Sequence, residues 1–146
     1  MNLLIQLLIG GFLIALTVGL HALAMDFIIR FTGLIEAPVR TKFKTLWRAV
    51  LSGGFVLIVF GVHVVMIWIW TMVYLFRSCS PLNNIPDAIY FSTTSYTTMG
   101  SNIMLDDSCH MLSGIESANG FILISWTTAF IFEVVSQLYR REVRSL

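Results

Sequence analysis

The sequence predicts an all-α integral membrane protein with three spanning helices and one shorter re-entrant helix. Of the 146 residues, 57% are hydrophobic and only 12% are charged, and the mean hydropathy is +0.83. Most of the chain therefore cannot face water. Three apolar runs are long enough to cross about 30 Å of hydrocarbon as helices, which takes roughly 20 residues each: Leu3 to Ala24, Ala49 to Phe76 and Met111 to Val135.

The first run ends in Ala22-Leu23-Ala24, which resembles the cleavage site of a signal peptide. The run lacks the basic segment that precedes the apolar part of such a peptide. We therefore expect residues 1–30 to form a retained helix that packs at the periphery of the bundle.

Basic residues set the orientation that we expect. Residues 31–48 form the predicted connection to the second helix, and lysines and arginines gather there and at the chain end: Arg30, Arg40, Lys42, Lys44, Arg48, Arg140, Arg141 and Arg144. Cytoplasmic segments carry such an excess. The connection, which can touch anionic headgroups, and the C-terminus are expected in the cytoplasm. The N-terminus and residues 78–110 are expected outside, in a multi-pass protein of the cell's inner (plasma) membrane.

Aromatic residues near both ends of the second run are typical of a helix that spans the membrane. Trp68, Trp70 and Tyr74 lie close together at one end, and Trp47 lies at the opposite end of the run. Tryptophan and tyrosine are enriched at both membrane interfaces. We interpret both groups as aromatic belts.

A fourth segment, Ile85 to Thr98, is too short to span the membrane but has the pattern of a helix. Asn84 can cap its start, Pro86 suits its first turn, and Asp87 complements the positive end of the helix dipole. Irregular backbone at membrane depth is tolerated only where protein or a wet cavity surrounds it. We predict a re-entrant helix whose partly negative C-terminal end favours a cation.

Thr97-Thr98-Met99-Gly100 follows directly after this helix. A threonine hydroxyl and a row of carbonyls can replace the water shell of a cation, provided that several copies of the loop surround it. One chain has one such loop. A symmetric assembly follows, and four chains around one axis is our expectation.

Two stretches resemble the pore region of the potassium-channel superfamily: "DAIYFSTTSYTTMG" and "LSGIESANGFILISWTTAFIFEVV". The likeness is to small bacterial two-helix ion-channel proteins, preceded here by one extra helix. It implies a pore domain at 49–146, with outer helix 49–76, pore helix 85–98, filter 97–103, inner helix 111–135 and cytoplasmic tail 136–146. It also implies a homotetramer in the lipid bilayer that conducts monovalent cations passively, with K⁺ or Na⁺ in the filter and no other cofactor.

The filter departs from the family pattern, which continues with an aromatic residue, a second glycine and usually an aspartate. Here the positions read Ser101, Asn102 and Ile103. Asparagine enters the left-handed region at modest cost, so we expect Asn102 to keep the backbone path. Ser101 removes a side chain that would wedge the filter against the helix behind it, and Ile103 removes a carboxylate. The filter residues are then Thr97, Thr98, Met99, Gly100, Ser101 and Asn102.

Three outcomes stay open for this filter. We favour a pore of poor selectivity among monovalent cations, because coordination number and rigidity underlie discrimination between potassium and sodium. A potassium-selective pore with a single filter glycine is the second, as in potassium translocators with four pore repeats. The third is a non-conducting structural or regulatory subunit.

The last helix carries Gly120 where the family has a hinge glycine, although close helix packing is an equal alternative. As a hinge, Gly120→Ala should lower open probability without changing ion preference. Ile124, Thr127 and Ile131 share its face and are predicted to line an inner vestibule. Ser125 and Thr128 are alternatives, since such hydroxyls often bond their own helix.

Acidic residues fall into three groups. Glu116 lies within a spanning helix, where carboxylates are costly and usually functional, and the resemblance favours bracing of the filter through Ser92, Thr93 or Ser95. Glu133 is expected to pair with an arginine: Arg30, Arg140 or Arg141. Asp106 and Asp107 would make a negative outer mouth, whereas Asp87 serves equally well as part of a helix cap.

The sequence does not settle the state of the two cysteines, and it gives no support for a metal site at the histidines. Cys79 and Cys109 bracket the re-entrant segment on one side of the membrane, and a disulfide or two free thiols are equally compatible with the sequence. His21, His63, His110 and Asp26 show no metal-ligand spacing on one helix face. We expect histidines with satisfied hydrogen bonds, and no metal beyond the permeant cation.

Other functional classes find no support in the sequence. It contains no nucleophile and base set, no metal motif and no phosphate-binding loop, so we do not expect an enzyme. The net charge is +1, and the chain has no basic face with interleaved aromatic residues, which excludes nucleic acid as the expected partner.

Overall fold

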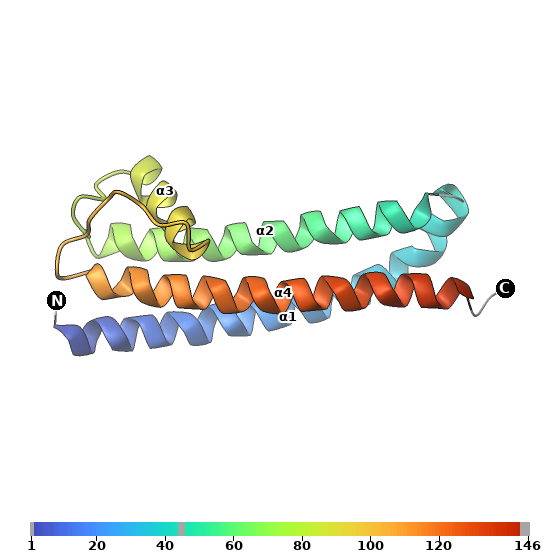
Figure 1. Cartoon of the computed structure of the whole chain (residues 1–146), viewed down its shortest axis with the longest axis horizontal. Helices are drawn as coiled ribbons and strands as arrows, with labels where there is room; N and C mark the ends of the chain where they lie inside the picture. Colours follow the sequence, from blue (N-terminus) through green and yellow to red (C-terminus); the bar gives the residue numbers. More distant parts are fainter. Residues whose placement is uncertain (1, 44–45, 144–146) are drawn as a thin grey trace.

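The computed structural model describes residues 2–43 and 46–143, with side chains through residue 138 and at residue 140. This part of the chain forms four α-helices: α1 (Leu3–Phe43), α2 (Trp47–Phe76), α3 (Ile85–Tyr96) and α4 (His110–Val143). Helices α1, α2 and α4 are long and apolar enough to cross a membrane. They run side by side along the long axis, and the short α3 lies beside α2 at the end where the chain begins (Figure 1).

Helix α1 is much longer than the predicted run from Leu3 to Ala24. It continues to Phe43, so the predicted connection at 31–48 is mostly helix. The helix continues because its apolar stripe does: Met25 and Ile28 are buried in a cluster with Phe55 of α2, and Ile35 and Val39 pack against a second cluster that contains Trp47 and Leu51 of the same helix. Lys44, Arg144 and the side chain of Arg141, which the orientation argument uses, lie outside the described residues.

Other helix ends differ less from the prediction. Helix α4 extends from the expected Met111–Val135 to His110–Val143, and α2 begins at Trp47 instead of Ala49. Helix α3 ends at Tyr96, two residues before the expected end. Its start is as predicted: the backbone N–H of Asp87 donates to Asn84 Oδ1 at 2.9 Å, and proline occupies the first turn. An asparagine cap satisfies an amide that the helix itself cannot.

The main core lies where α2, α3 and α4 meet. Trp70 and Tyr74 of α2 are fully buried there against Phe91 and Tyr96 of α3 and Leu112 of α4. Trp70 and Tyr74 therefore do not form the aromatic belt that the sequence predicted, while Trp68 is exposed. This core fixes α3 relative to the two long helices behind it.

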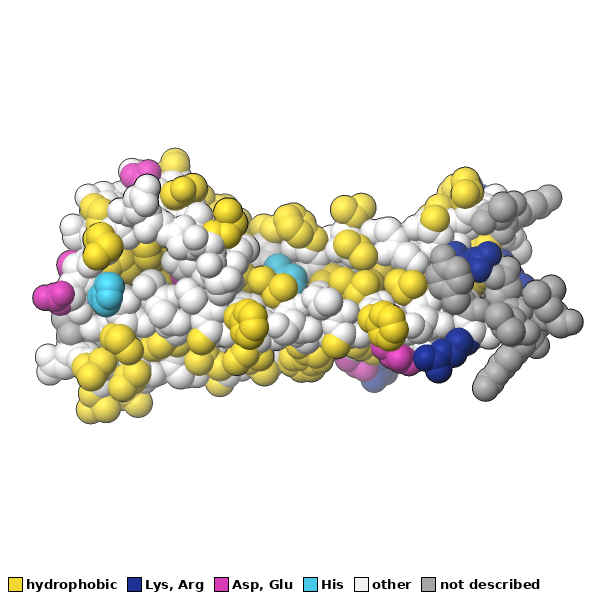
Figure 2. Space-filling view, viewed as in Figure 1, with side chains coloured by type: hydrophobic (Ala, Val, Ile, Leu, Met, Phe, Trp, Pro, Cys, Tyr) yellow, Lys and Arg dark blue, Asp and Glu magenta, His cyan; other side chains and the backbone are white. Residues whose placement is uncertain are grey.

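Away from this core, the long helices expose apolar side chains, among them Leu8, Phe12, Leu57, Phe60 and Phe132. Figure 2 shows hydrophobic side chains along the bundle, acidic side chains both at the α3 end and beside basic ones toward the opposite end, and basic side chains toward that opposite end. An apolar band between two charged ends matches a protein whose solvent is lipid.

Helix α1 is attached to α4 by specific contacts. At the start of α4, Gln6 donates to the carbonyl of Asp107 at 3.0 Å and accepts from the N–H of Met111 at 3.0 Å. Gly10 lies so close to Ile115 that an added Cβ would come within 2.6 Å of its Cδ1 atom. Such close approach is typical of membrane helix contacts built on small residues.

Candidate functional site

The hydroxyl-rich segment directly follows α3 and turns sharply there. Thr98 and Gly100 have positive φ values of 60° and 78°. The N–H of Thr98 donates to the carbonyl of Ser95, and the N–H of Gly100 donates to that of Thr94. Thr98, Met99 and Gly100 are exposed, Met99 by 78%. The segment is thus anchored on the end of α3 and presented at the surface of the single chain.

The expectation for Asn102 is wrong. Among the described residues, positive φ values outside glycine fall at Ser78 and Thr98, not at Asn102. The backbone beyond Gly100 is instead held by Ser101, whose Oγ accepts the N–H of Ile103 at 3.0 Å. Serine can form such a local turn without left-handed backbone. Asn102 therefore does not need the positive φ that a second glycine would adopt.

A hollow of about 210 Å³ lies beside Ser101. Its lining includes Phe91 and Ser95 of α3, Ser113 and Ser117 of α4, and Ser101 itself. The space therefore separates the outer part of the segment from the helices behind it. This is the place that a large side chain at position 101 would occupy.

Glu116 joins α4 to the two neighbouring helices. Its carboxylate is fully buried and accepts hydrogen bonds from the hydroxyls of Tyr74 at 2.6 Å and Ser92 at 2.5 Å. Both hydroxyls thus have an acceptor within the buried core, where an unpaired polar group would be costly. The contact to α3 was expected through Ser92, Thr93 or Ser95, and it is Ser92 that makes it. Thr93 donates to the carbonyl of Ile89 in its own helix.

Tyr74 is a member of this site that the sequence did not reveal. The sequence indicated an aromatic residue at the membrane interface instead, because Trp68 and Trp70 are close to it in sequence. Only the packing of α2 against α4 shows that its hydroxyl points to a carboxylate 42 residues away.

Gly120 packs directly against the end of α3. A Cβ at this position would overlap the carbonyl oxygen of Tyr96. The packing alternative is therefore the one that the structure shows, and α4 runs through Gly120 as continuous helix. The neighbour is backbone next to the predicted filter. If that filter selects ions, Gly120→Ala should not leave ion preference unchanged, as a hinge would.

The predicted vestibule residues Ile124, Thr127 and Ile131 share one apolar hollow of about 390 Å³ with Thr97. Thr127 thus lines the hollow, but its hydroxyl is engaged in hydrogen bonds. Its hydroxyl lies 2.9 Å from His63 Nε2 and 3.1 Å from His21 Nε2. Thr128, the alternative, also lines the hollow but donates to the carbonyl of Ile124 in its own helix.

The histidines are only partly satisfied. Both ring nitrogens of His63 have partners, but the buried Nδ1 of His21 has none. Their ring centroids lie 5.3 Å apart, a proximity that sequence spacing could not reveal because they belong to different helices. His110 is exposed, and Asp26 forms an ion pair with Arg30 at 2.8 Å. The described residues contain no group of three metal-ligating side chains.

A disulfide closes the segment between α2 and α4. Cys79 and Cys109 are bonded, with Cα atoms 5.8 Å apart, and the described chain has no free cysteine. The free-thiol alternative is thereby excluded. Asp106 and Asp107 are exposed beside this bond, and Ser108 donates to the Asp106 carboxylate at 2.8 Å.

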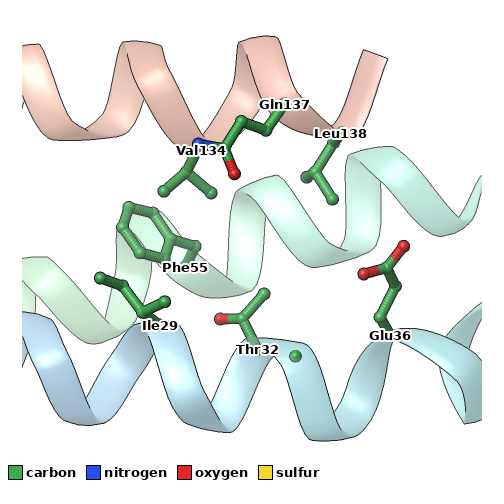
Figure 3. Close-up of a pocket in the computed structure, with 8 residues that line it drawn as sticks. Ile29, Thr32, Glu36, Phe55, Val134, Gln137 and Leu138 are labelled. Carbon is green, nitrogen blue, oxygen red and sulfur yellow. The ribbon is translucent and has the colours of Figure 1, made fainter. Parts of the chain in front are cut away.

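The opposite end of the bundle contains a small hollow of about 80 Å³ between α1, α2 and α4. Figure 3 shows Thr32, Glu36 and Gln137 among its lining. Gln137 donates to Glu133 at 2.8 Å. Arg30 binds Asp26, so the expected pairing of Glu133 with Arg30 is wrong. This hollow is remote from the segment after α3.

A family model described as "Ion channel" matches residues 60–137, more than half of the chain. The match includes most of α2, all of α3, the segment with positive φ values, and α4 through Gln137, and it leaves out α1. No curated protein and no solved structure matches the chain at a significant level.

Proposed function

Since the chain belongs to the ion-channel family, we propose that four copies of it surround one pathway and conduct monovalent cations passively. The observation that carries this proposal is the exposed turn Thr98 to Gly100 at the C-terminal end of α3. A helix C-terminus has a partial negative charge, which stabilises a cation near it.

Several copies are needed because one exposed turn cannot replace the water shell of an ion. Four such turns around an axis supply enough oxygen ligands, with K⁺ or Na⁺ as the bound ion. Homo-oligomers with closed rotational symmetry achieve this with one chain type. The lipid bilayer covers the remaining apolar faces of the bundle.

We place the α3 end outside the cell and the C-terminus in the cytoplasm of a plasma-membrane protein. The basic residues Arg40, Lys42 and Arg48 support this orientation, since cytoplasmic ends carry such an excess. The outer mouth then includes Asp106 and Asp107, which raise the local concentration of cations.

Poor selectivity is proposed from the hollow beside Ser101. Nothing in one chain fills the space between this part of the filter and the helices behind it, and Ile103 offers no carboxylate to tether the outer end. Selectivity depends on the number and rigidity of the ion's ligands. An inner filter built on Thr98 to Gly100 with a wider outer part would pass both potassium and sodium.

The test is the reversal potential of the purified protein in planar bilayers, with potassium on one side and sodium on the other. We expect a value near zero that moves toward the potassium limit in Ser101→Tyr plus Asn102→Gly. Asn102→Gly alone is the matched control, because Asn102 does not use left-handed backbone and should give the wild-type value.

Other results would select a different reading. A wild-type value already at the potassium limit would establish a selective channel with one filter glycine. Native mass spectrometry in nanodiscs provides the assembly measurement, with a particle of four 16.5 kDa chains expected. A tetramer that carries no current would indicate a structural or regulatory subunit.

A further inference from the structure

A chain of hydrogen bonds connects all four helices at the inner end of α3. Tyr96 of α3 lies with its hydroxyl 2.9 Å from His63 Nδ1 of α2. The other nitrogen of His63 is 2.9 Å from the Thr127 hydroxyl of α4, which in turn is 3.1 Å from His21 Nε2 of α1. We call these four residues the Tyr96–His21 chain.

The Thr127 hydroxyl has one proton to donate, and two proton arrangements use that proton within the chain. In one, Tyr96 donates to His63, His63 donates to Thr127, and Thr127 donates to His21. In the other, His21 donates to Thr127, Thr127 donates to His63, and His63 donates to Tyr96. Removal of any inner member leaves a polar group without a partner in an apolar interior, which is costly.

Tyr96 is the residue through which this chain reaches the filter. It is fully buried, it is the last residue of α3, and Thr97 follows it. Its carbonyl is held against Gly120. The hydroxyl at one side and the carbonyl at the other therefore determine where α3 ends and where the filter turn begins.

We propose that His63, Thr127 and His21 are positioning residues for the filter, acting through Tyr96. The residue farthest along the chain, His21, belongs to α1, which lies outside the family match. The extra helix is thereby part of the ion-selecting machinery. That consequence rests on the proposed function, whereas the positioning itself is a property of the fold.

Further contacts keep α1 at a constant distance from α4, as the proposal requires. Asn119 donates to the buried Thr17 hydroxyl at 2.9 Å, and Gln6 binds the start of α4. His21 itself is fully buried and lies beside the Trp126 ring, with centroids 5.4 Å apart. Helix α1 thus presents His21 to Thr127 on a rigid support.

Hydrogen exchange of the segment 97–103 in nanodiscs tests the positioning without any need for current. We expect Thr127→Val to accelerate exchange of these amides about fivefold, the factor that corresponds to one hydrogen bond of ordinary net strength. Thr128→Val is the matched control: the same change, one residue away, in the same hollow, but with its hydroxyl bonded only within α4. It should leave the exchange rate as in the wild type.

The role of α1 is tested separately by His21→Phe. We expect the same acceleration as with Thr127→Val. Equal exchange rates in Thr127→Val and Thr128→Val would overturn the proposal. Faster amide exchange with Thr127→Val but not with His21→Phe would show that α1 does not contribute to the positioning.

Single-channel conductance tests whether the Tyr96–His21 chain affects ion conduction. This measurement has the advantage that only folded, inserted channels are counted. The changes caused by Tyr96→Phe and His63→Phe should be strongly non-additive, because both remove the same interaction. Additive changes would contradict a common path through Tyr96. A wild-type tetramer without current would instead refute the proposed function and leave the exchange measurement to decide the positioning.

Discussion

Glu116 connects three helices through one carboxylate, and its loss should be felt in stability. Glu116→Ala removes the acceptor of the buried Tyr74 hydroxyl, whereas the Ser92 hydroxyl keeps the Ile67 carbonyl at 3.1 Å. We expect the free energy of unfolding to fall by about 1–3 kcal/mol, the cost of an unsatisfied buried group. Thermal unfolding of the purified protein measures this.

Glu133→Ala is the control for that change. Glu133 is exposed and accepts a hydrogen bond from Gln137 one turn along the same helix. Surface changes of this kind usually stay within about 0.5 kcal/mol. If the two alanine variants unfolded at the same temperature, the brace would contribute nothing.

Gly120 is the other residue whose substitution should have a large effect. The Cβ of Gly120→Ala would overlap the backbone of Tyr96, which cannot move aside as a flexible side chain can. Overpacking of this kind costs about 1–3 kcal/mol. Because the displaced atoms adjoin the filter, both the unfolding temperature and the reversal potential should change.

Gly114→Ala, in the same helix, is the matched variant. An added Cβ there meets nothing within 4 Å, and alanine favours helix over glycine by about 1 kcal/mol. Gly114→Ala should therefore be neutral or stabilising. Gly120→Ala with the stability and reversal potential of Gly114→Ala would refute the packing interpretation.

At the scale of elements, the disulfide Cys79–Cys109 closes the segment that contains α3 and the filter. The bond spans 30 residues, and closing a loop of about that length stabilises a fold by about 3–4 kcal/mol through the unfolded chain. Cys79→Ser plus Cys109→Ser should lower the free energy of unfolding by that amount and so lower the denaturant midpoint. Tryptophan fluorescence during chemical unfolding gives this midpoint.

Reduction of the wild type provides an independent version of the same comparison. Reductant should shift the wild-type midpoint to that of the double variant and leave the double variant unchanged. An identical midpoint for oxidised and reduced wild type would contradict stabilisation through the unfolded chain.

At the scale of the whole molecule, Asp106 and Asp107 are exposed at the end of the bundle that carries α3. In a tetramer these carboxylates are repeated around the mouth and attract cations. Asp106→Asn plus Asp107→Asn should lower the inward single-channel current about twofold at low ionic strength. At 1 M salt the effect should vanish, since the screening length falls to about 3 Å.

Asp26→Asn controls for the change in total charge, because Asp26 lies in α1 and is paired with Arg30. It should leave the current unchanged at either salt concentration. A loss of current in the mouth variant that persists at 1 M salt would mean that these residues act structurally and not through their field.

Much of the fold follows from local sequence signals. Length and hydropathy predicted three spanning helices, and the Asn84, Pro86 and Asp87 pattern predicted the start of α3 correctly. Such signals are local because a cap or an apolar run depends on neighbouring residues in the chain. The contact between Glu116 and Ser92 was also predicted, although as one of three options.

Helix ends beyond the apolar runs were harder to predict. Beyond Ala24, α1 packs through Met25 and Ile28 against Phe55 and through Ile35 and Val39 against Trp47 and Leu51. No run of consecutive residues encodes these contacts. The role of Asn102 was wrongly predicted for a related reason. The hydrogen bond from Ile103 to Ser101 holds this backbone without a left-handed residue.

By itself, then, the sequence determined that this is an all-helical membrane protein with three long apolar helices and a short fourth helix followed by a hydroxyl-rich segment, since composition and periodicity are sufficient for that. The tertiary structure decided how distant segments meet. It bonded Cys79 to Cys109, placed Gly120 against Tyr96, and aligned His21, Thr127 and His63 into one chain. Each of these depends on the packing of separate helices, which sequence spacing along one chain does not specify.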